Sequence, residues 1–490
     1  KPRAAKTEEQ KRKPRAAKTE EQKRKPRAAK TEEQKRKPRA AKAKVVKKPT
    51  KNIKPTKTIE KQKKLKITRS NIPPEINIGT AGHVDEGKST LIQLLTGKFP
   101  DEHSEELKRG ITIRLGYADA DIMKCNSCDE PDCWTVYDEC EKCGTKTEVA
   151  RKVSFVDAPG HEILMQVMLS GAALMDGALM LIAANNEVPQ AQTREHLAAL
   201  EALGIQKIVV IQNKVDLVTS EQAKQNYMDI KSFLKGTIAE NAPIIPMSAL
   251  HGANLDVLLS AIQYFIPTPD RKVDEPMRMM VARSFDINRP GTKPSKLKGG
   301  VLGGSLITGK LNVGDEVVIL PGLKKKKGKD TKFIPVKTKV ESIQVGSMGS
   351  VDEAQPGGLL ALATKIDPAM ARSDNLAGNI ISAVGAEPPV VNKILLKVNL
   401  FKEVVGTDTR DTVKPVINGE TLLLTVGTAT TVGLVEKIEK KGRIALTLRP
   451  QIAMNPRSKI AISRRFQKRW RLIGYGEVDE FNELEINISS

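Results

Sequence analysis

The stretch Gly82-His83-Val84-Asp85-Glu86-Gly87-Lys88-Ser89 fits the spacing G-x-x-x-x-G-K-[ST] of a phosphate-binding loop. The apolar run before it, residues 76–81, is typical of a strand, and residues 90–95 after it are typical of the first turns of a helix. Glycines let successive backbone N–H groups turn toward a phosphate, and the helix N-terminus adds its dipole. We therefore expect phosphate contacts from Asp85, Glu86, Gly87, Lys88, Ser89 and Thr90.

The chemistry of two of these side chains is specific. The Lys88 ammonium would neutralise charge on the outer phosphates, and the Ser89 hydroxyl would ligate Mg²⁺. A strand directly before the loop and a helix directly after it argue against a chance match to this spacing.

Length and composition bound the class of protein. At 490 residues the chain is too long for one domain, and 39% hydrophobic residues suffice for packed cores. No apolar run reaches the roughly 18 residues needed to cross a bilayer, and no secretory signal pattern is visible. We expect a cytoplasmic protein with no membrane partner.

The net charge of +23 is concentrated at one end of the chain. Residues 1–70 hold 29 Lys and Arg against 7 Asp and Glu, which leaves 52 against 51 for residues 71–490. Residues 1–36 are three copies of Lys-Pro-Arg-Ala-Ala-Lys-Thr-Glu-Glu-Gln-Lys-Arg. With a Pro in each copy and no large apolar side chain to bury, we expect residues 1–70 to be a disordered tail. It is either a polycation that strengthens non-specific RNA binding or a passive solvated segment.

Residues 71–270 alternate strand-like and helical patterns. The runs Val153–Val156, Ala178–Ala183 and Ile208–Ile211 are apolar throughout, as strands buried on both faces of a sheet are. Helical spacing occurs at Thr193–Leu203 and Ser220–Leu234. This alternation predicts an α/β domain with a mostly parallel sheet and helices on both faces.

The pattern changes beyond Pro276 to short β-branched runs between turn residues, such as Gly314–Gly322. This pattern is typical of antiparallel barrels. A second boundary near Glu387 predicts one β-barrel over 277–386 and another over 387–490. We expect Lys324–Lys327 to lie in a solvated polar loop, with a binding patch as the less favoured alternative.

Two motifs after the loop supply the parts of a γ-phosphate switch. Thr112 lies in a segment suited to a mobile loop, where its hydroxyl would complete Mg²⁺ coordination when a γ-phosphate is present. In Asp157-Ala158-Pro159-Gly160, Asp157 would hold Mg²⁺ through water and the Gly160 N–H would sense the γ-phosphate. His161 follows directly and is the catalytic candidate, because a group there could orient the attacking water. The alternative is a structural role.

Two further motifs point to guanine. In Asn213-Lys214-Val215-Asp216, the Asp216 carboxylate can accept hydrogen bonds from guanine N1–H and the 2-amino group, which adenine does not offer. Ser248, Ala249 and Leu250 would place backbone N–H groups near guanine O6. Because all five motifs occur in the required order after strand-like runs, the sequence predicts a GTPase that binds GTP or GDP with Mg²⁺.

An insertion precedes Asp157 and contains all five cysteines of the chain. The pairs Cys125-x-x-Cys128 and Cys140-x-x-Cys143 have the spacing of a tetrahedral Cys₄ zinc site. All four positions are filled by protein, so a structural role is expected. Cys133 is interpreted as not taking part, and disulfides are disfavoured in a reducing compartment.

These residues resemble translational GTPases, and most closely the gamma subunits of archaeal and eukaryotic translation initiation factor 2. The resemblance covers about 75–476. Elongation factor Tu shares the three-domain plan but usually lacks the cysteine knuckle. The most specific matches, besides the knuckle at 125–143, are Ser104–Thr112, Ser170–Gly177, Arg283–Gly291 and Leu297–Val301.

The resemblance implies a heterotrimer with alpha and beta subunits that carries methionylated initiator tRNA to the small ribosomal subunit, with GTP hydrolysis as the release switch. The chain departs from the family at Glu86, where His is common. The alternatives are an elongation-type carrier of aminoacyl-tRNA and a non-hydrolysing GTP-dependent scaffold. The basic Arg464–Arg471 segment, with its interleaved aromatics, is interpreted as a surface for an RNA backbone. The alternative is a barrel strand with Arg465, Gln467 and Arg469 facing outward, and both can hold at once. Tentative tRNA contacts are Arg283, Gly299, Gly300, Val301 and Arg469.

Overall fold

A computed structural model describes most of the chain beyond the repeats. The described residues are 66–67, 69–98, 116–159, 164–327, 330–406, 411–456, 458–466 and 469–485. Residues 1–65, Thr112, Gly160 and His161 lie outside these ranges, so the roles assigned to them above stay predictions.

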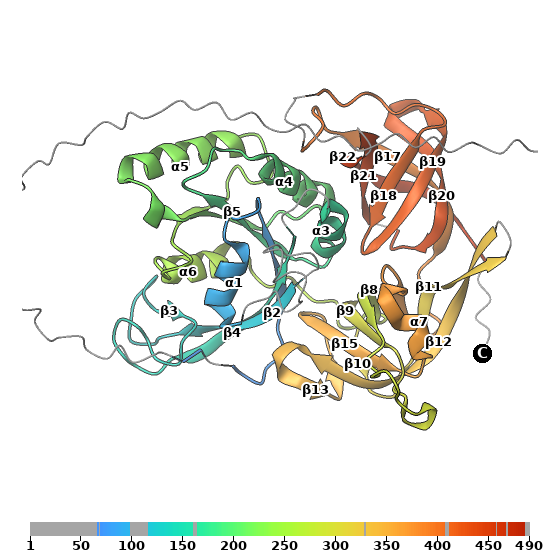
Figure 1. The fold of residues 1–490 in the computed structure, drawn as a ribbon, viewed down its shortest axis with the longest axis horizontal. Coiled ribbons are helices and arrows are strands. Elements are labelled where there is room, and N and C mark those ends of the chain that lie inside the picture. The colour runs from blue at the N-terminus through green and yellow to red at the C-terminus, as the bar shows by residue number, and fades with distance from the viewer. Residues whose placement is uncertain are drawn as a thin grey trace, which may run out of the picture. The chain divides into compact units, whose positions relative to one another are not determined.

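The first domain is built on a seven-stranded sheet with the order β3-β2-β4-β1-β5-β6-β7 (Figure 1). The strands β4, β1, β5, β6 and β7 run parallel. At one edge β2 pairs antiparallel with β4, and β3 pairs antiparallel with β2. The mostly parallel sheet predicted from the apolar runs is confirmed. The strands are β1 (Ile76–Ala81), β2 (Gly116–Lys124), β3 (Trp134–Thr135), β4 (Glu148–Asp157), β5 (Gly177–Ala183), β6 (Ile208–Asn213) and β7 (Ile244–Pro246).

Helices cover both faces of this sheet. α1 (Lys88–Thr96) and α6 (Leu255–Phe265) pack their buried leucines with β1 and β4 in one core cluster. On the other face lie α3 (Met165–Ala172), α4 (Ala191–Leu203) and α5 (Ser220–Leu234), in a second cluster. The last two are the helices expected from sequence periodicity. α5 begins with a capping box formed by Thr219 and Gln222.

Two closed barrels follow. The first is a ring of six strands that closes where β11 pairs with β12, and β13 (Gly349–Val351) adds to β12. Its strands are β8 (Arg278–Phe285), β9 (Val301–Thr308), β11 (Glu316–Lys327), β12 (Asp330–Val345), β15 (Leu359–Thr364) and β16 (Ile380–Ala383), with the short pair β10 (Leu311–Asn312) and β14 (Glu353–Ala354) beside them. The second barrel has the order β17-β20-β19-β18-β21-β22. Its strands are β17 (Val390–Leu400), β18 (Thr421–Val426), β19 (Ala429–Glu439), β20 (Arg443–Ala453), β21 (Lys459–Phe466) and β22 (Arg469–Glu483).

The lysine run Lys324–Lys327 does not lie in a loop, so that prediction is wrong. β11 continues past a register shift between Ile319 and Leu323, and the lysines pair with β12, Lys325 opposite Lys332. The far ends of β11 and β12 extend as a hairpin arm beyond the rest of the barrel, so they have little core to face (Figure 1). Such an arm needs no apolar alternation, and a polar sequence can therefore form a strand there.

The basic segment 464–471 is not one strand either. It is the hairpin between β21 and β22, with Arg464 paired to Arg471 and Arg465 to Trp470. The reversal places Arg464 beside Glu420, to which it donates hydrogen bonds, whereas Arg471 reaches Glu195 on α4.

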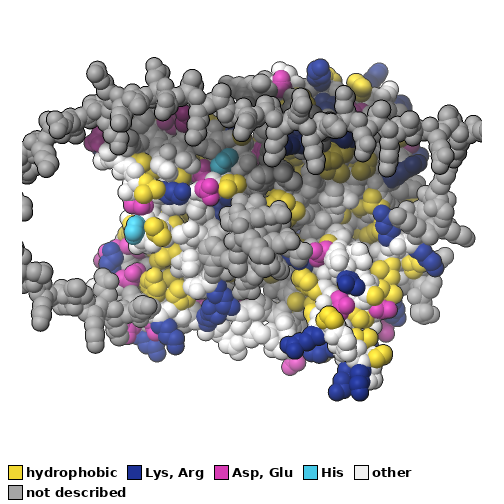
Figure 2. Space-filling view, in the orientation of Figure 1, with side chains coloured by type: hydrophobic (Ala, Val, Ile, Leu, Met, Phe, Trp, Pro, Cys, Tyr) yellow, Lys and Arg dark blue, Asp and Glu magenta, His cyan; other side chains and the backbone are white. Residues whose placement is uncertain are grey.

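The described surface has no single dominant charge. In the space-filling view, Lys and Arg lie among Asp and Glu over the visible face (Figure 2). This agrees with the nearly even 52 basic and 51 acidic residues of 71–490. No helix among the described residues is long and apolar enough to span a membrane.

The helix α4 also contacts the second barrel. Glu195 forms an ion pair with Arg471 of β22, and their side chains are 3% and 11% exposed. Leu197 and Leu200 share a core cluster with Ala461 and Leu472 of the barrel. A buried ion pair surrounded by apolar contacts makes this interface sensitive to loss of either charge.

We expect Arg471→Leu to lower the free energy of unfolding by about 3–5 kcal/mol at pH 7, because it leaves the Glu195 carboxylate buried without its cation. Urea unfolding measures the loss. The double variant Glu195→Gln/Arg471→Leu removes both charges and should recover most of it. Arg465→Leu, an exposed residue of the same hairpin, should change stability by less than about 0.5 kcal/mol. Equal losses in the single and double variants would contradict this account.

Candidate nucleotide site and cysteine cluster

The groups predicted to bind a nucleotide meet at one edge of the parallel sheet. The loop 82–87 follows β1, Asp157 is the last residue of β4, and Asn213 is the last residue of β6. Ser248 comes just after β7. The carboxyl ends of parallel strands form a common edge, where ligands of open α/β sheets bind. The order of motifs in the sequence therefore corresponds to one place in the fold.

The phosphate-binding loop encloses the Lys88 amino group. Lys88 Nζ donates hydrogen bonds to the carbonyl oxygens of Gly82 at 3.0 Å and His83 at 2.6 Å. Gly87 has φ of 92° and Asp85 has φ of 63°, both in the left-handed region. At Gly87 this conformation favours glycine, and an added Cβ would lie 2.4 Å from the Asn213 amide nitrogen. The loop thus curls around a cation, as a phosphate cradle requires.

Two oxygen groups suited to magnesium lie side by side below this loop. The Ser89 hydroxyl donates to Asp157 Oδ2 at 3.0 Å, and the Thr80 hydroxyl donates to Asp157 Oδ1 at 2.6 Å. Asp157 is fully buried. A hydroxyl and a carboxylate are hard oxygen donors of the kind that Mg²⁺ prefers, so Ser89 and Asp157 fit the ion by their chemistry.

The buried amide of Asn213 joins the phosphate side of the site to the base side. Its Nδ2 donates to the carbonyl oxygen of Glu86 at 2.8 Å, and its Oδ1 accepts from the Ala249 N–H at 2.9 Å. One side chain therefore sets the spacing between the loop after β1 and the loop after β7. The motif Asn213-Lys214-Val215-Asp216 indicates contact with the base, but its spacing does not indicate this linking role.

The groups expected to contact guanine lie on the loops that follow β6 and β7. Lys214 has φ of 60° in the left-handed region, and Asp216 follows with its side chain 25% exposed. The nearby Ser248 hydroxyl holds the pKa of Asp216 below its usual range. The carboxyl is therefore ionised and able to accept hydrogen bonds at neutral pH. Leu250 is 73% exposed at this rim.

A histidine that sequence analysis missed supports the loop from α4. The Gly82 N–H donates to His196 Nδ1 at 2.8 Å, and His196 is 1% exposed. Burial lowers the pKa of His196 to about 3, with smaller effects from Lys88 and His83. The ring is neutral and accepts at Nδ1, so its proton is on Nε2. The helical periodicity of 191–203 shows which residues are buried, but it does not show what they face.

The four cysteines singled out by spacing converge. Cys125 Sγ lies 3.5 Å from Cys143 Sγ, and Cys128 Sγ lies 3.8 Å from Cys140 Sγ. All four sulfurs lie within 4.8 Å of one another. Zn–S bonds of about 2.3 Å in a tetrahedron place sulfurs about 3.8 Å apart, so the cluster fits zinc.

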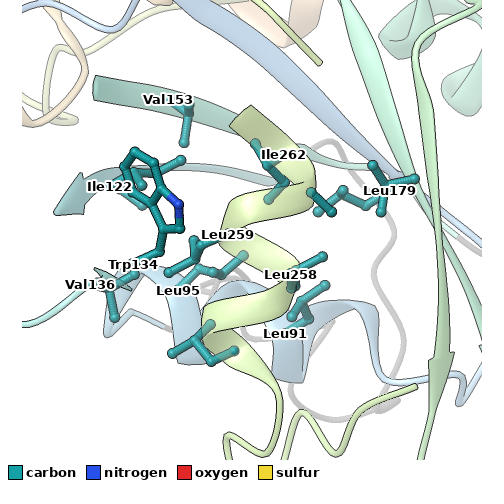
Figure 3. Close-up of a cluster of buried hydrophobic side chains, with 14 of the residues drawn as sticks. Leu91, Leu95, Ile122, Trp134, Val136, Val153, Leu179, Leu258, Leu259 and Ile262 are labelled. Atoms are coloured by element: carbon teal, nitrogen blue, oxygen red, sulfur yellow. The ribbon is translucent and has the colours of Figure 1, made fainter. Parts of the chain in front are cut away.

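The knuckle shares its core with the nucleotide-binding domain. Trp134 and Val136 pack against residues of α6 and α1 such as Leu259 and Leu95 (Figure 3). Cys133 is 1% exposed in this core and lies outside the four-sulfur group. Lys142 adds a salt bridge to Asp256 of α6 at 3.4 Å.

The tentative tRNA contacts lie in two different barrels. Arg283 lines a cleft of about 650 Å³ in the first barrel, with its Nε 3.0 Å from Asp374 Oδ1. Gly299 and Gly300 have a packing role there, because a Cβ on Gly299 would lie 1.7 Å from the Thr364 carbonyl oxygen. Val301 begins β9, and Arg469 begins β22 of the second barrel.

Two family profiles match the chain. The profile described as "Elongation factor Tu GTP binding domain" matches residues 73–268. The profile described as "Initiation factor eIF2 gamma, C terminal" matches residues 392–478. The first covers the α/β domain, and the second lies within the second barrel.

Curated relatives match over nearly their whole length. The chain is 52% identical over 402 residues to the translation initiation factor 2 subunit gamma of Methanococcus maripaludis, covering 82% of this chain and 98% of the relative. It is 52% identical over 406 residues to the same subunit of Pyrococcus furiosus, covering 83% and 98%. Among solved structures, the elongation factor SelB of M. maripaludis with the GTP analogue GppNHp superposes with a TM-score of 0.62, at 25% identity, over 85% of this chain and 81% of that chain.

Proposed function

Because the chain belongs to the family of translation initiation factor 2 gamma subunits, we propose that in its GTP-bound state it binds methionylated initiator tRNA and delivers it to the small ribosomal subunit. The chain is a GTP-dependent initiation factor and a GTPase by family. The observation that carries the proposal is the convergence of the phosphate, magnesium and base motifs on one sheet edge, within a chain of this family.

The proposed division of labour follows the three domains. Residues 71–270 bind the nucleotide, with Lys88 on the phosphates, Ser89 and Asp157 at Mg²⁺, and Asp216 on guanine. Thr112 and Gly160 complete the site when a γ-phosphate is present. Bound Mg²⁺ would offset phosphate charge as hydrolysis proceeds.

The barrels, 277–386 and 387–490, are proposed to hold tRNA and the partner subunits alpha and beta. The cleft lined by Arg283 is a tRNA-facing candidate in the first barrel. Gly299, Gly300 and Val301 are further candidates in this barrel, where Gly299 lies against the Thr364 carbonyl and Gly300 is hydrogen-bonded to Thr364 and Ile366. In the second barrel, Arg469 is the candidate.

The delivery proposal is tested by filter binding of methionylated initiator tRNA with GTP, GDP and xanthosine triphosphate. The wild-type chain with its partner subunits should retain this tRNA with GTP and much less with GDP. Asp216→Asn exchanges an acceptor for a donor opposite the 2-amino group of guanine. It should weaken GTP binding by a few kcal/mol and transfer tRNA retention to xanthosine triphosphate. Asp229→Asn on the exposed face of α5 is the matched control. GTP-dependent retention that survives in Asp216→Asn would refute the base assignment.

A second expectation concerns His161. If it orients the attacking water, His161→Ala should slow GTP hydrolysis about a hundredfold with ribosomal partners, because such a group acts mainly in the transition state. GTP affinity should change by less than about twofold. His161→Gln keeps a hydrogen-bonding group and should retain part of the rate. Single-turnover hydrolysis measures both variants, and an unchanged rate would leave His161 with a structural role only.

The cysteine cluster is proposed to hold one structural zinc through Cys125, Cys128, Cys140 and Cys143. Elemental analysis of the purified protein should find about one zinc per chain. Cys125→Ser or Cys140→Ser should lose the metal and lower stability. Nucleotide binding should largely persist, because the four sulfurs do not lie at the strand ends that hold the nucleotide motifs. Cys133→Ser is the matched control and should keep the zinc. Metal-free wild-type protein would exclude the assignment.

A further inference from the structure

The phosphate-binding loop contains a carboxyl group that no solvent reaches. Glu86 is 0% exposed. Its Oε2 accepts a hydrogen bond from the backbone N–H of Ala183, the last residue of β5. Its Oε1 has no hydrogen bond of normal geometry among the described residues. The side chain thus connects the loop to the neighbouring strand β5, and the Asn213 amide connects the Glu86 carbonyl to β6.

Few charges are available to stabilise an anion at this position. The cations near the carboxyl are Lys88 from α1 and Lys214 after β6, and the end of β5 contributes only the uncharged groups of Ala183 and Asn186. Lys88 is already bonded to the carbonyl oxygens of Gly82 and His83. Burial raises the pKa of Glu86 to about 7, and the Ala183 hydrogen bond, the two lysines and the Asn186 side chain lower it less. The free protein therefore holds this group near half-ionised at neutral pH.

A bound nucleotide changes this balance in one direction. Its phosphates bring several negative charges onto the loop that contains Glu86, and like charges favour the neutral form of a carboxyl. The phosphates also attract the Lys88 ammonium of α1, so less of its charge is left to stabilise an ionised Glu86 carboxyl. Both effects favour a protonated carboxyl in the complex, and the Asn186 amide can serve such a group as either donor or acceptor.

We propose that Glu86 is a proton-linked positioning residue, whose carboxyl takes up a proton from solvent when a guanine nucleotide binds and in its neutral form holds the phosphate-binding loop against the end of β5. The proposal rests on the nucleotide site proposed above. Below about pH 7 the Glu86 carboxyl is already mostly protonated in the free protein, so the affinity for the nucleotide varies little with pH. Above pH 7 binding requires proton uptake, and affinity falls as pH rises.

Calorimetric titration with GDP and Mg²⁺ tests this on the full chain. At pH 8, two buffers with different ionisation enthalpies give the number of protons exchanged. Because the free carboxyl would be about one-tenth protonated at that pH, the wild type should take up nearly one proton more than Glu86→Gln. The dissociation constant of the wild type should rise about fivefold between pH 7 and pH 8, and that of Glu86→Gln should rise much less. Glu187→Gln, which removes an exposed carboxyl four residues after the end of β5, should behave as the wild type.

The outcomes separate this proposal from the nucleotide site itself. If the wild type does not bind GDP, the proposed function fails. If the wild type and Glu86→Gln bind GDP with the same proton uptake, the site stands and the role of Glu86 is refuted. Should Glu86→Gln fail to fold, the wild type still decides: binding of GDP without proton uptake at pH 8 overturns the proposal.

Discussion

One buried side-chain amide holds the nucleotide site together. Asn213 donates to the Glu86 carbonyl and accepts from the Ala249 N–H, so two loops from different strands have a fixed spacing. An unsatisfied buried polar group costs about 1–3 kcal/mol, and each loop is therefore held by the requirement that its backbone groups stay paired. The Lys88 amino group then lies against the carbonyl oxygens of its own loop, and the Ser89 hydroxyl meets Asp157.

The same site is connected to the second barrel through α4. His196 accepts the Gly82 N–H at the start of the phosphate loop, and the adjacent Glu195 pairs with Arg471 of β22. Two consecutive residues of α4 thus contact different parts of the molecule: His196 contacts the phosphate loop, and Glu195 contacts the second barrel. Because both side chains are buried, a shift of this helix would disturb both contacts. The Gln166 side chain of α3 adds a hydrogen bond from the Thr425 hydroxyl of β18.

Sequence reasoning failed where polar segments form β-structure. Lys324–Lys327 lacks apolar alternation, so its pattern does not indicate a strand, and the pattern of 464–471 does not show that the chain reverses within this segment. Their backbones pair with neighbouring strands, Lys325 with Lys332 of β12 and Arg464 with Leu422 of β18. The apolar strands β4, β5 and β6 were predicted because burial on both faces demands hydrophobic residues at every position.

The sequence by itself determined the chemistry of this protein. The glycines and Lys88 of the loop, the Asp216 carboxylate and the paired cysteines act through local spacing, so their residue types and order predict a GTPase with a Cys₄ knuckle. Only the tertiary structure decided how polar groups are buried. The neutral state of His196 and the solvent-free position of the Glu86 carboxyl depend on segments about a hundred residues away, which close over them when the chain folds. Burial, unlike spacing, is a property of the whole fold, and it sets which protonation state each group adopts.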